Sequence, residues 1–318
     1  MKLSQFAVLL ALGLTWGSSY LFIKVLVDDI DPILVVGGRI LFGVLVLVSI
    51  VRVRGLPLPR RRATYGWLFF MGTLGTATPF FLISWSEEYI DSGTAAVLNS
   101  TVPLFVAILS IWFLSDEYLS PAKILGLCVG FAGVAVLSGG DLLNFDRDAL
   151  FGDALMLIAS LSYGLAAIVA RRHLRGDHPI SLAACQFSFA LVIMTPLVLL
   201  FEPPTEAAHL SVKEWGAWLA LGFAGTGLAY WAYYWLIGEV GAVRTTMVTF
   251  ILPAVGVFLG WLALDEDLGW NALAGLVLIL AGIALVMELA VSRRWRRPLL
   301  NNYGSRRGTV SAAEPAAD

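Results

Sequence analysis

Residues 16–39 read WGSSYLFIKVLVDDIDPILVVGGR, and 147 positions later residues 163–186 read YGLAAIVARRHLRGDHPISLAACQ. Each stretch begins with an aromatic residue and a glycine, continues with a basic residue and a proline, and ends on a long polar side chain at the same spacing. A register kept over this length indicates an internal duplication. The chain is therefore predicted to consist of two related halves.

The correspondence continues along both halves at offsets of 149 and 150 residues. The matching positions are Gly72 with Gly222, Gly75 with Gly225, Thr76 with Thr226, Trp85 with Trp235, Pro103 with Pro253, Glu117 with Glu266, Gly126 with Gly275, and Gly133 with Gly282. Because the offset drifts by only three residues, we predict one five-helix repeat at 1–139 and a second at 151–290. The arginine-rich segment 291–318 is predicted to be a basic, mobile cytoplasmic tail.

The composition is that of a membrane protein. Apolar residues make up 58% of the chain and charged residues 14%, whereas a soluble domain carries about 25% charge. A bilayer core of about 30 Å requires about 20 apolar residues per helix. Such stretches occur at residues 6–27, 33–51, 65–86, 93–114, 122–138, 151–170, 180–201, 215–237, 245–264 and 268–287. The predicted fold is an all-α membrane protein with ten transmembrane helices.

The distribution of Lys and Arg predicts the topology. Seventeen of these residues fall on the side of the N-terminus, and only Arg147 and Lys213 fall on the other. The positive-inside rule therefore predicts that both termini are cytoplasmic, which agrees with an even number of spans. Since each half holds five spans, the halves are inverted relative to each other. Inverted repeats are typical of carriers that open a site near the bilayer midplane to either side in turn.

Several motifs resemble a known family. They are Trp16-Gly17-Ser18, Lys24, Pro32 and Arg39, followed by Pro103, Glu117, Gly126 and Gly133. In order and spacing they resemble the EamA family of the drug/metabolite transporter superfamily, over residues 5–139 and 151–288. The resemblance implies a ten-helix secondary transporter in the cell membrane. It also implies alternating-access export of small metabolites, such as amino acids or related compounds, or of drugs.

Arg39 is a candidate substrate-binding residue. It lies seven residues beyond Pro32, about 10 Å from the outer end of its helix. A charge at a helix centre costs about 2.5–3.5 kcal/mol, so such residues usually face the bundle interior or a water-filled cavity. We expect Arg39 to favour a substrate with a carboxylate or other anionic group. The alternatives are that its guanidinium extends to the outer headgroups or forms a structural pair with Glu87 or Glu88.

Lys24 and Tyr20 share a helical face with Gly13 and Gly17, which allow close helix approach. That face is predicted to point inward, so both side chains are candidates for substrate contact. The alternative for Lys24 is that its ammonium reaches the outer surface.

Asn99 and Thr249 are candidates because each lies four residues before a proline, Pro103 or Pro253. A proline lacks the backbone donor that would bind the carbonyl at i−4, so that carbonyl becomes available to a polar group. We predict helix breaks at both prolines and polar substrate contacts at Asn99 and Thr249. The alternative is a kink whose polar side chains bond locally.

Departures from the repeat give two further candidates, because Tyr163 stands where the first half has Trp16, and Gln186 where it has Arg39. An unmirrored charge makes any function of Arg39 asymmetric. A change of this kind in a cavity is expected to determine which substrate binds.

The eighth predicted span is rich in aromatic side chains. Tyr230 and Tyr233 lie near its middle and share a face with Thr226. Tyrosines at this depth are not interfacial anchors, so we predict that the face with Thr226, Tyr230 and Tyr233 forms a cavity wall.

The sequence favours no enzyme, metal site or cofactor. Glu88 and Asp153 are the available carriers for proton coupling. No HExxH, GxSxG or phosphate-binding motif is present, and Cys128 and Cys185 lie in apolar spans. The predicted partners are a small-molecule substrate and the lipid bilayer, with no nucleic acid, for a monomer or homodimer. The alternatives are a membrane-embedded enzyme and a non-transporting receptor or assembly factor.

Overall fold

A computed structural model describes most of the chain. The described residues are 2–113, 121–139, 146–174, 176–202, 204–241, 245, 247–267 and 269–301, with the main chain alone at 204 and 287–301. Glu117 and residues 302–318 of the predicted tail lie outside them.

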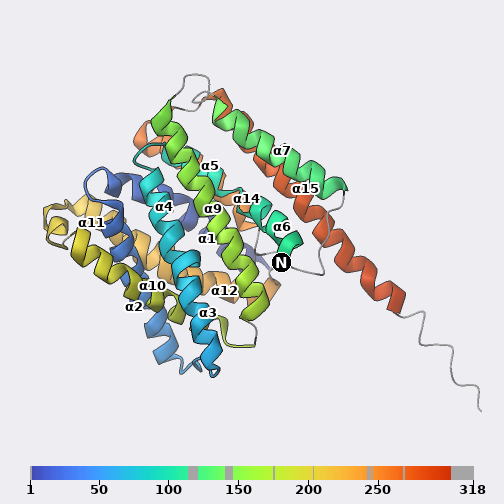
Figure 1. Cartoon of the computed structure of the whole chain (residues 1–318), viewed down its shortest axis with the longest axis horizontal. Coiled ribbons are helices and arrows are strands. Elements are labelled where there is room, and N and C mark those ends of the chain that lie inside the picture. The colour runs from blue at the N-terminus through green and yellow to red at the C-terminus, as the bar shows by residue number, and fades with distance from the viewer. Residues whose placement is uncertain are drawn as a thin grey trace, which may run out of the picture.

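Every regular element of the described residues is helical (Figure 1). The first half comprises α1 (Leu3–Val27), α2 (Pro32–Val53), α3 (Arg62–Gly72), η1 (Thr73–Ala77), α4 (Thr78–Ser86), α5 (Ser92–Asn99), α6 (Val102–Phe113) and α7 (Pro121–Leu137). The second half comprises α9 (Arg147–His173), α10 (Pro179–Phe201), η2 (Pro204–His209), α11 (Val212–Leu219), η3 (Ala220–Leu228), α12 (Ala229–Val240), α14 (Val248–Leu264) and α15 (Trp270–Asn301). The last helix thus extends over the first eleven residues of the segment predicted to be the tail.

Six helical segments in the described part of the chain are long and apolar enough to cross a membrane. They are Leu3–Val27, Pro32–Val53, Arg62–Ser86, Ser92–Phe113, Arg147–His173 and Pro179–Phe201. Three shorter apolar helices are Pro121–Leu137, Val248–Leu264 and Trp270–Val286. Helices therefore lie at the predicted spans, and the count of ten crossings stays a prediction.

Local capping explains where several helices begin. The Asp31 carboxylate accepts a hydrogen bond from the backbone N–H of Ile33, and Pro32 occupies the first position of α2, where its missing donor costs nothing. The Asp146 carboxylate accepts from the N–H groups of Asp148 and Ala149 at the start of α9.

Two π-helical segments interrupt corresponding segments of the two halves. η1 separates α3 from α4, and η3 separates α11 from α12. Residues 73–77 and 223–227 are 150 positions apart and are rich in glycine and threonine. Short π-helical insertions of this kind often occur at functional sites because they redirect side chains and main-chain groups.

The two prolines act differently. In the first half the helix is interrupted at Ser100 and Thr101, just before Pro103, as predicted. The predicted break at Pro253 is wrong, because α14 continues through it from Val248 to Leu264. Pro253 lies in the second turn, so the lost donor affects only one bond near the helix start.

Several contacts between helices stay the same when each helix is replaced by its counterpart in the other half. α2 packs on α10, and α5 packs on α14, so each pair joins equivalent segments of the two halves. α1 packs on α14 as α6 packs on α9, and α2 packs on η3 as α10 packs on α3 and η1. Exchanging the halves therefore preserves these neighbours, as two related repeats would require.

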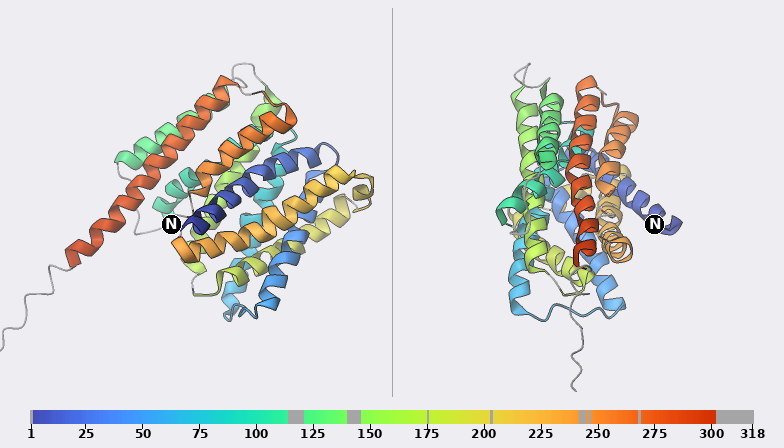
Figure 2. Two further views of the ribbon diagram at one scale, coloured as in Figure 1. Left: turned by 180° about the vertical axis from the view of Figure 1, so that it is seen from behind. Right: turned by 90° about the vertical axis from the view of Figure 1, so that its right-hand side faces the viewer.

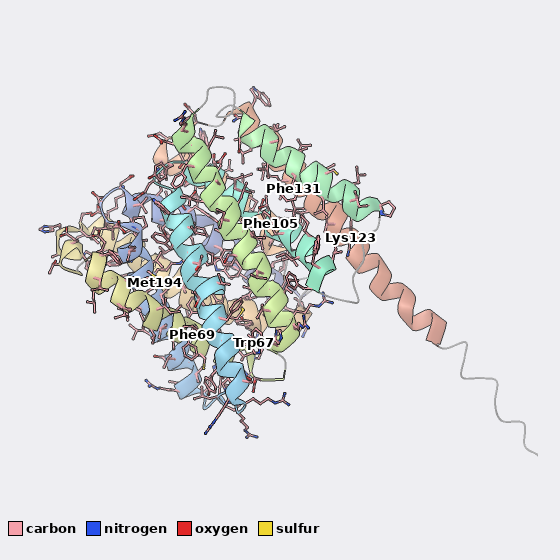
Figure 3. The ribbon with its side chains drawn as sticks, in the orientation of Figure 1. Trp67, Phe69, Phe105, Lys123, Phe131 and Met194 are labelled. Carbon is pink, nitrogen blue, oxygen red and sulfur yellow. The ribbon has the colours of Figure 1, made fainter. Side chains whose placement is uncertain are left out.

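α7 and α15, one from each half, pack against each other as a separate pair at the side of the bundle (Figures 1 and 2). Phe105 of α6 and Phe131 of α7 point toward each other, with ring centroids 5.6 Å apart, and join this pair to the body (Figure 3). A Cβ on Gly282 would lie 2.5 Å from the backbone nitrogen of Gly130 and 2.6 Å from the carbonyl oxygen of Gly126. Main chains thus touch across this pair.

Gly282→Val is expected to destabilise the protein by about 1–3 kcal/mol, because backbone atoms of α7 cannot make room for the added carbons. Thermal unfolding of the purified protein measures the loss. Gly238→Ala is the control, since a Cβ there meets nothing within 4 Å. Equal stability of both variants would contradict the close packing of α7 and α15.

Candidate functional site

A cavity of about 450 Å³ lies at the centre of the bundle, between helices of both halves. Its lining comes from α1 to α6 with η1 in the first half, and from α9, α10, α12 and α14 in the second. Eight of the nine side chains predicted to contact substrate line it, namely Tyr20, Arg39, Asn99, Tyr163, Gln186, Tyr230, Tyr233 and Thr249. The tertiary structure thus brings together residues that are up to 229 positions apart in the sequence.

Arg39 is held by two contacts at the cavity wall. Its Nε donates a hydrogen bond of 3.1 Å to Oγ1 of Thr226, which lies in η3 and is fully buried. Its guanidinium carbon lies 3.7 Å from the centroid of the Phe80 ring, a cation–π arrangement. Both contacts fix the side chain without neutralising its charge. The predicted structural pair with Glu87 or Glu88 is not the arrangement that holds it.

Gln186 forms the equivalent contact in the other half. Its Nε2 donates a hydrogen bond of 2.9 Å to Oγ1 of Thr76, which lies in η1. Thr76 and Thr226 are matching repeat positions, as are Gln186 and Arg39. The two hydrogen bonds are therefore equivalent in the two halves, and we call each of them a clamp. Only the clamp from Arg39 to Thr226 includes a charged side chain.

The lining of the cavity, as far as the structure describes it, has a net charge of one positive group. Arg39 is the only charged residue there, and it is 5% exposed. A desolvated cation that no acidic group in the lining balances attracts an anion. A guanidinium also binds carboxylate or phosphate oxygens through its remaining N–H groups.

Aromatic side chains form one wall of the cavity. The indole Nε1–H of Trp16 donates a hydrogen bond of 3.1 Å to the carbonyl of Gly225 in η3. The Trp16 ring lies 5.7 Å from the Tyr230 ring and 5.3 Å from the Tyr233 ring, and Tyr234 also contributes to the lining. Such a wall suits the apolar part of a small ligand.

Asn99 presents an acceptor to the cavity. Its Oδ1 is buried and has no hydrogen-bond partner, and α5 ends at this residue. A buried polar atom without a partner is rare and costs stability, so its retention needs a reason. A bound ligand with a donor group would satisfy it. Thr249 lies at the repeat-related position of α14 and also lines the cavity.

Three other predicted residues lie away from this cavity. Lys24 donates hydrogen bonds of 2.5 and 3.4 Å to the carbonyls of Glu87 and Ile90. Glu88 is exposed, and Asp153 lies in the second turn of α9 with 4% exposure. Substrate contact by Lys24 is not supported by this placement.

Thr76 and Phe80 were not predicted to belong to the site, whereas Thr226 and Trp16 were predicted to face the cavity without the partners that they have. Thr76 and Thr226 anchor the two clamps, Phe80 lies on the Arg39 guanidinium, and Trp16 anchors the aromatic wall. A signal was available for Thr76 and Thr226, because both follow a glycine at matching positions. None existed for Phe80, whose partner lies on another helix.

The cavity is asymmetric between the two ends of the bundle. We call the end that carries Arg52, Arg54, Arg171 and Arg172 the basic end, and the opposite end, with Asp28, Asp31, Glu87 and Glu88, the acidic end. Tyr234, Ile237 and Val248 line the cavity toward the basic end. Their repeat mates at the acidic end, Ser84, Glu87 and Leu98, are fully buried and do not line it. The cavity thus extends toward the basic end and is closed at the acidic end.

A group of contacts closes the acidic end, and we call it the acidic-end seal. It consists of Lys24, Glu87, Ile90, Ser92, Gly93 and Glu266. The Glu266 carboxylate accepts hydrogen bonds of 2.7 and 2.9 Å from the backbone N–H groups of Ser92 and Gly93. These are the first residues of α5, whose own N-cap residue, Asp91, makes no side-chain capping hydrogen bond to the helix. Glu266 therefore caps α5 from a distant part of the chain.

Comparison with known proteins gives a consistent result. Residues 4–139 and 150–288 match the EamA-like transporter family. The chain is 27% identical to the uncharacterized transporter YoaV of Bacillus subtilis over 275 residues, covering 86% of this chain and 94% of the relative. It is also 27% identical to the uncharacterized inner membrane transporter YedA of Escherichia coli K12, covering 95% and 98% of the two chains. A solved crystal structure shares the fold, with a TM-score of 0.65, 20% identity and coverage of 91% and 99%.

Proposed function

This chain belongs to the EamA-like transporter family, and we propose that it is an alternating-access secondary transporter that exports small organic molecules across the cytoplasmic membrane. The membrane-transporter assignment follows from the family and from the relatives. The mechanism, the direction of transport and the substrate class are the proposed parts.

One observation carries the proposal: a central cavity between two sets of equivalent helices, with an arginine that has no acidic partner in the lining. Its volume of about 450 Å³ is within the usual range for small-molecule sites. The substrate class proposed from Arg39, Asn99 and the aromatic wall is a small organic anion with an apolar or aromatic part. Amino acids and related carboxylates belong to this class.

Three features support alternating access. The helix neighbours are preserved when the halves are exchanged, and each half carries a π-helical segment at the same position. The cavity extends to one end only. In an inverted repeat, each half can adopt the conformation that the other has here, which would open the acidic end and close the basic end.

Transport by the purified protein in liposomes tests the proposal. We expect saturable flux of at least one small carboxylate, accelerated by the same compound on the opposite side, because a loaded carrier returns faster than an empty one in an exchanger. A panel of amino acids, organic acids, nucleobases and cationic drugs identifies the class. A folded protein that transports none of the anionic compounds would contradict the proposal.

Asn99→Ala is expected to weaken substrate binding by about threefold to tenfold, because one neutral hydrogen bond contributes about 0.5–1.5 kcal/mol. Folding stability is measured without ligand for comparison, because the variant also loses the hydrogen bond between the Asn99 side chain and Tyr20. Ligand-induced shifts in the unfolding temperature measure the affinity. Thr195→Ala is the control, because this exposed threonine bonds only its own helix, to the Leu191 carbonyl. Wild-type affinity in Asn99→Ala would exclude Asn99 from the site.

A further inference from the structure

Glu87 is a buried acidic residue for which the proposed site has no use. It follows directly after α4, one residue beyond the Arg62–Ser86 segment, and its side chain is 0% exposed. Neither carboxyl oxygen has a hydrogen-bond partner. Burial of an ionised carboxylate without hydrogen bonds is strongly unfavourable, whereas burial of a neutral carboxylic acid is far less so.

The neighbouring charges do not compensate for this burial. Lys24 of α1 is the nearest cation, but its ammonium is bound to the main-chain carbonyls of Glu87 and Ile90. Glu266, from the turn before α15, acts against a negative charge on Glu87, whereas Arg39 of α2 and the main chain of Lys24 favour one more weakly. Tyr20 of α1 is a further titratable group that interacts with this carboxyl group. Asp153 is the buried acid on α9, the helix packed against α4.

The Glu87 side chain lies at the closed acidic end of the cavity. Glu87 belongs to the acidic-end seal, and its repeat mate Ile237 lines the cavity at the basic end. In the exchanged conformation, the surroundings of Glu87 would become like those of Ile237, which is partly exposed. Water would then reach the carboxyl group, with Lys24 beside it.

We propose that Glu87 is a proton-binding site that controls opening of the acidic end: it is a neutral carboxylic acid while the seal is closed and ionises when the seal opens. On opening, the O–H bond breaks, the electron pair stays on the carboxylate, and the proton passes to water. This inference rests on the proposed function, because it assumes that the acidic end opens during the transport cycle.

The direction of the pH dependence follows. Burial raises the pKa of Glu87 well above its ordinary value, and Lys24 opposes this shift. The protonated form favours the sealed state, so a fall in pH closes the acidic end and a rise in pH opens it. For one proton, the ratio of open to sealed molecules changes by up to about tenfold per pH unit.

Cysteine labelling tests the site without any substrate. Ser84 is fully buried at the acidic end and outside the cavity lining, and its hydroxyl has no partner. Ser84→Cys, in a chain with Cys128→Ala and Cys185→Ala, should therefore react with a water-soluble maleimide only when that end opens. The rate is divided by that of the unfolded chain at the same pH, which removes the titration of the thiol itself.

The normalised rate is expected to rise with pH by up to about tenfold per unit in the parent. In Glu87→Gln it should stay at the low-pH level throughout, because glutamine mimics the neutral acid. Glu88→Gln, a change at the exposed neighbour, should follow the parent. A rate independent of pH in the parent, or an unchanged pH profile in Glu87→Gln, would overturn the proposal.

Infrared spectroscopy gives a second measurement, which detects the protonation state of Glu87 directly. It uses the chain with its native cysteines and without Ser84→Cys. We expect the carbonyl band of a protonated carboxylic acid at neutral pH, with a component lost in Glu87→Gln and kept in Glu88→Gln. The absence of that component would overturn the proposal even if labelling varied. If the protein showed the expected labelling and infrared results but transported no substrate, the proposed function would be contradicted and the proton-binding role of Glu87 would stand.

Discussion

Replacing Arg39 by glutamine is expected to lower the affinity for an anionic substrate by about 30-fold to several thousandfold. The removal of one partner from a desolvated charge pair costs about 2–5 kcal/mol, which corresponds to this range. Glutamine already forms the equivalent bond to threonine in the other half, through Gln186 and Thr76. The substitution should therefore keep the clamp to Thr226 and remove only the charge.

The measurement is substrate affinity, from the shift in unfolding temperature and from the concentration dependence of flux. Arg52→Gln is the control, because Arg52 is exposed at the basic end and does not line the cavity. Neutral compounds of similar shape should bind the wild type and Arg39→Gln about equally. If Arg39→Gln bound carboxylates with wild-type affinity, the anionic substrate class would be incorrect.

Glu266→Gln is expected to open the acidic end more often. The carboxylate accepts two main-chain hydrogen bonds at the start of α5, and a bond to a charged group contributes about 1.5–3 kcal/mol. A neutral amide has one acceptor atom and no charge to interact with the helix dipole. The loss of at least one such bond should raise the fraction of open molecules by about tenfold or more.

The labelling rate of Ser84→Cys, in the chain with Cys128→Ala and Cys185→Ala, measures this change. Glu214→Gln provides a matched control, because Glu214 forms a capping box with Ser211 at the start of its own helix and is partly exposed. That variant should label at the parent rate. An unchanged rate in Glu266→Gln would mean that the cap does not hold the acidic end closed.

The sequence predicted the class of fold for a clear reason. Apolar composition, long uncharged stretches and repeat spacing are properties of the chain itself, and a membrane requires helices whatever their arrangement. Arg39 was identified from its depth in an apolar helix, and Tyr20, Tyr230 and Tyr233 from their helical spacing. Asn99 and Thr249 were identified from the prolines that follow them, and Tyr163 and Gln186 from departures from the repeat. The family match at 4–139 and 150–288 has almost the limits of the two predicted repeats.

Only the tertiary structure decided which polar groups meet. Successive residues of a helix point about 100° apart, and sequence position near a helix end does not determine which way a side chain turns. Glu88 was therefore selected as a proton carrier, whereas the buried acid is its neighbour Glu87. Lys24 was placed in the cavity, but it bonds to main-chain carbonyls of the acidic-end seal.

What the sequence determined by itself was an all-helical membrane transporter with an unmirrored arginine. The clamps from Arg39 to Thr226 and from Gln186 to Thr76 required the folded structure, because each joins helices more than 100 residues apart in the chain. The closure of one end also appeared only there. The sequence pattern describes what the two predicted repeats share, whereas packing determines that the cavity extends toward one end and not the other.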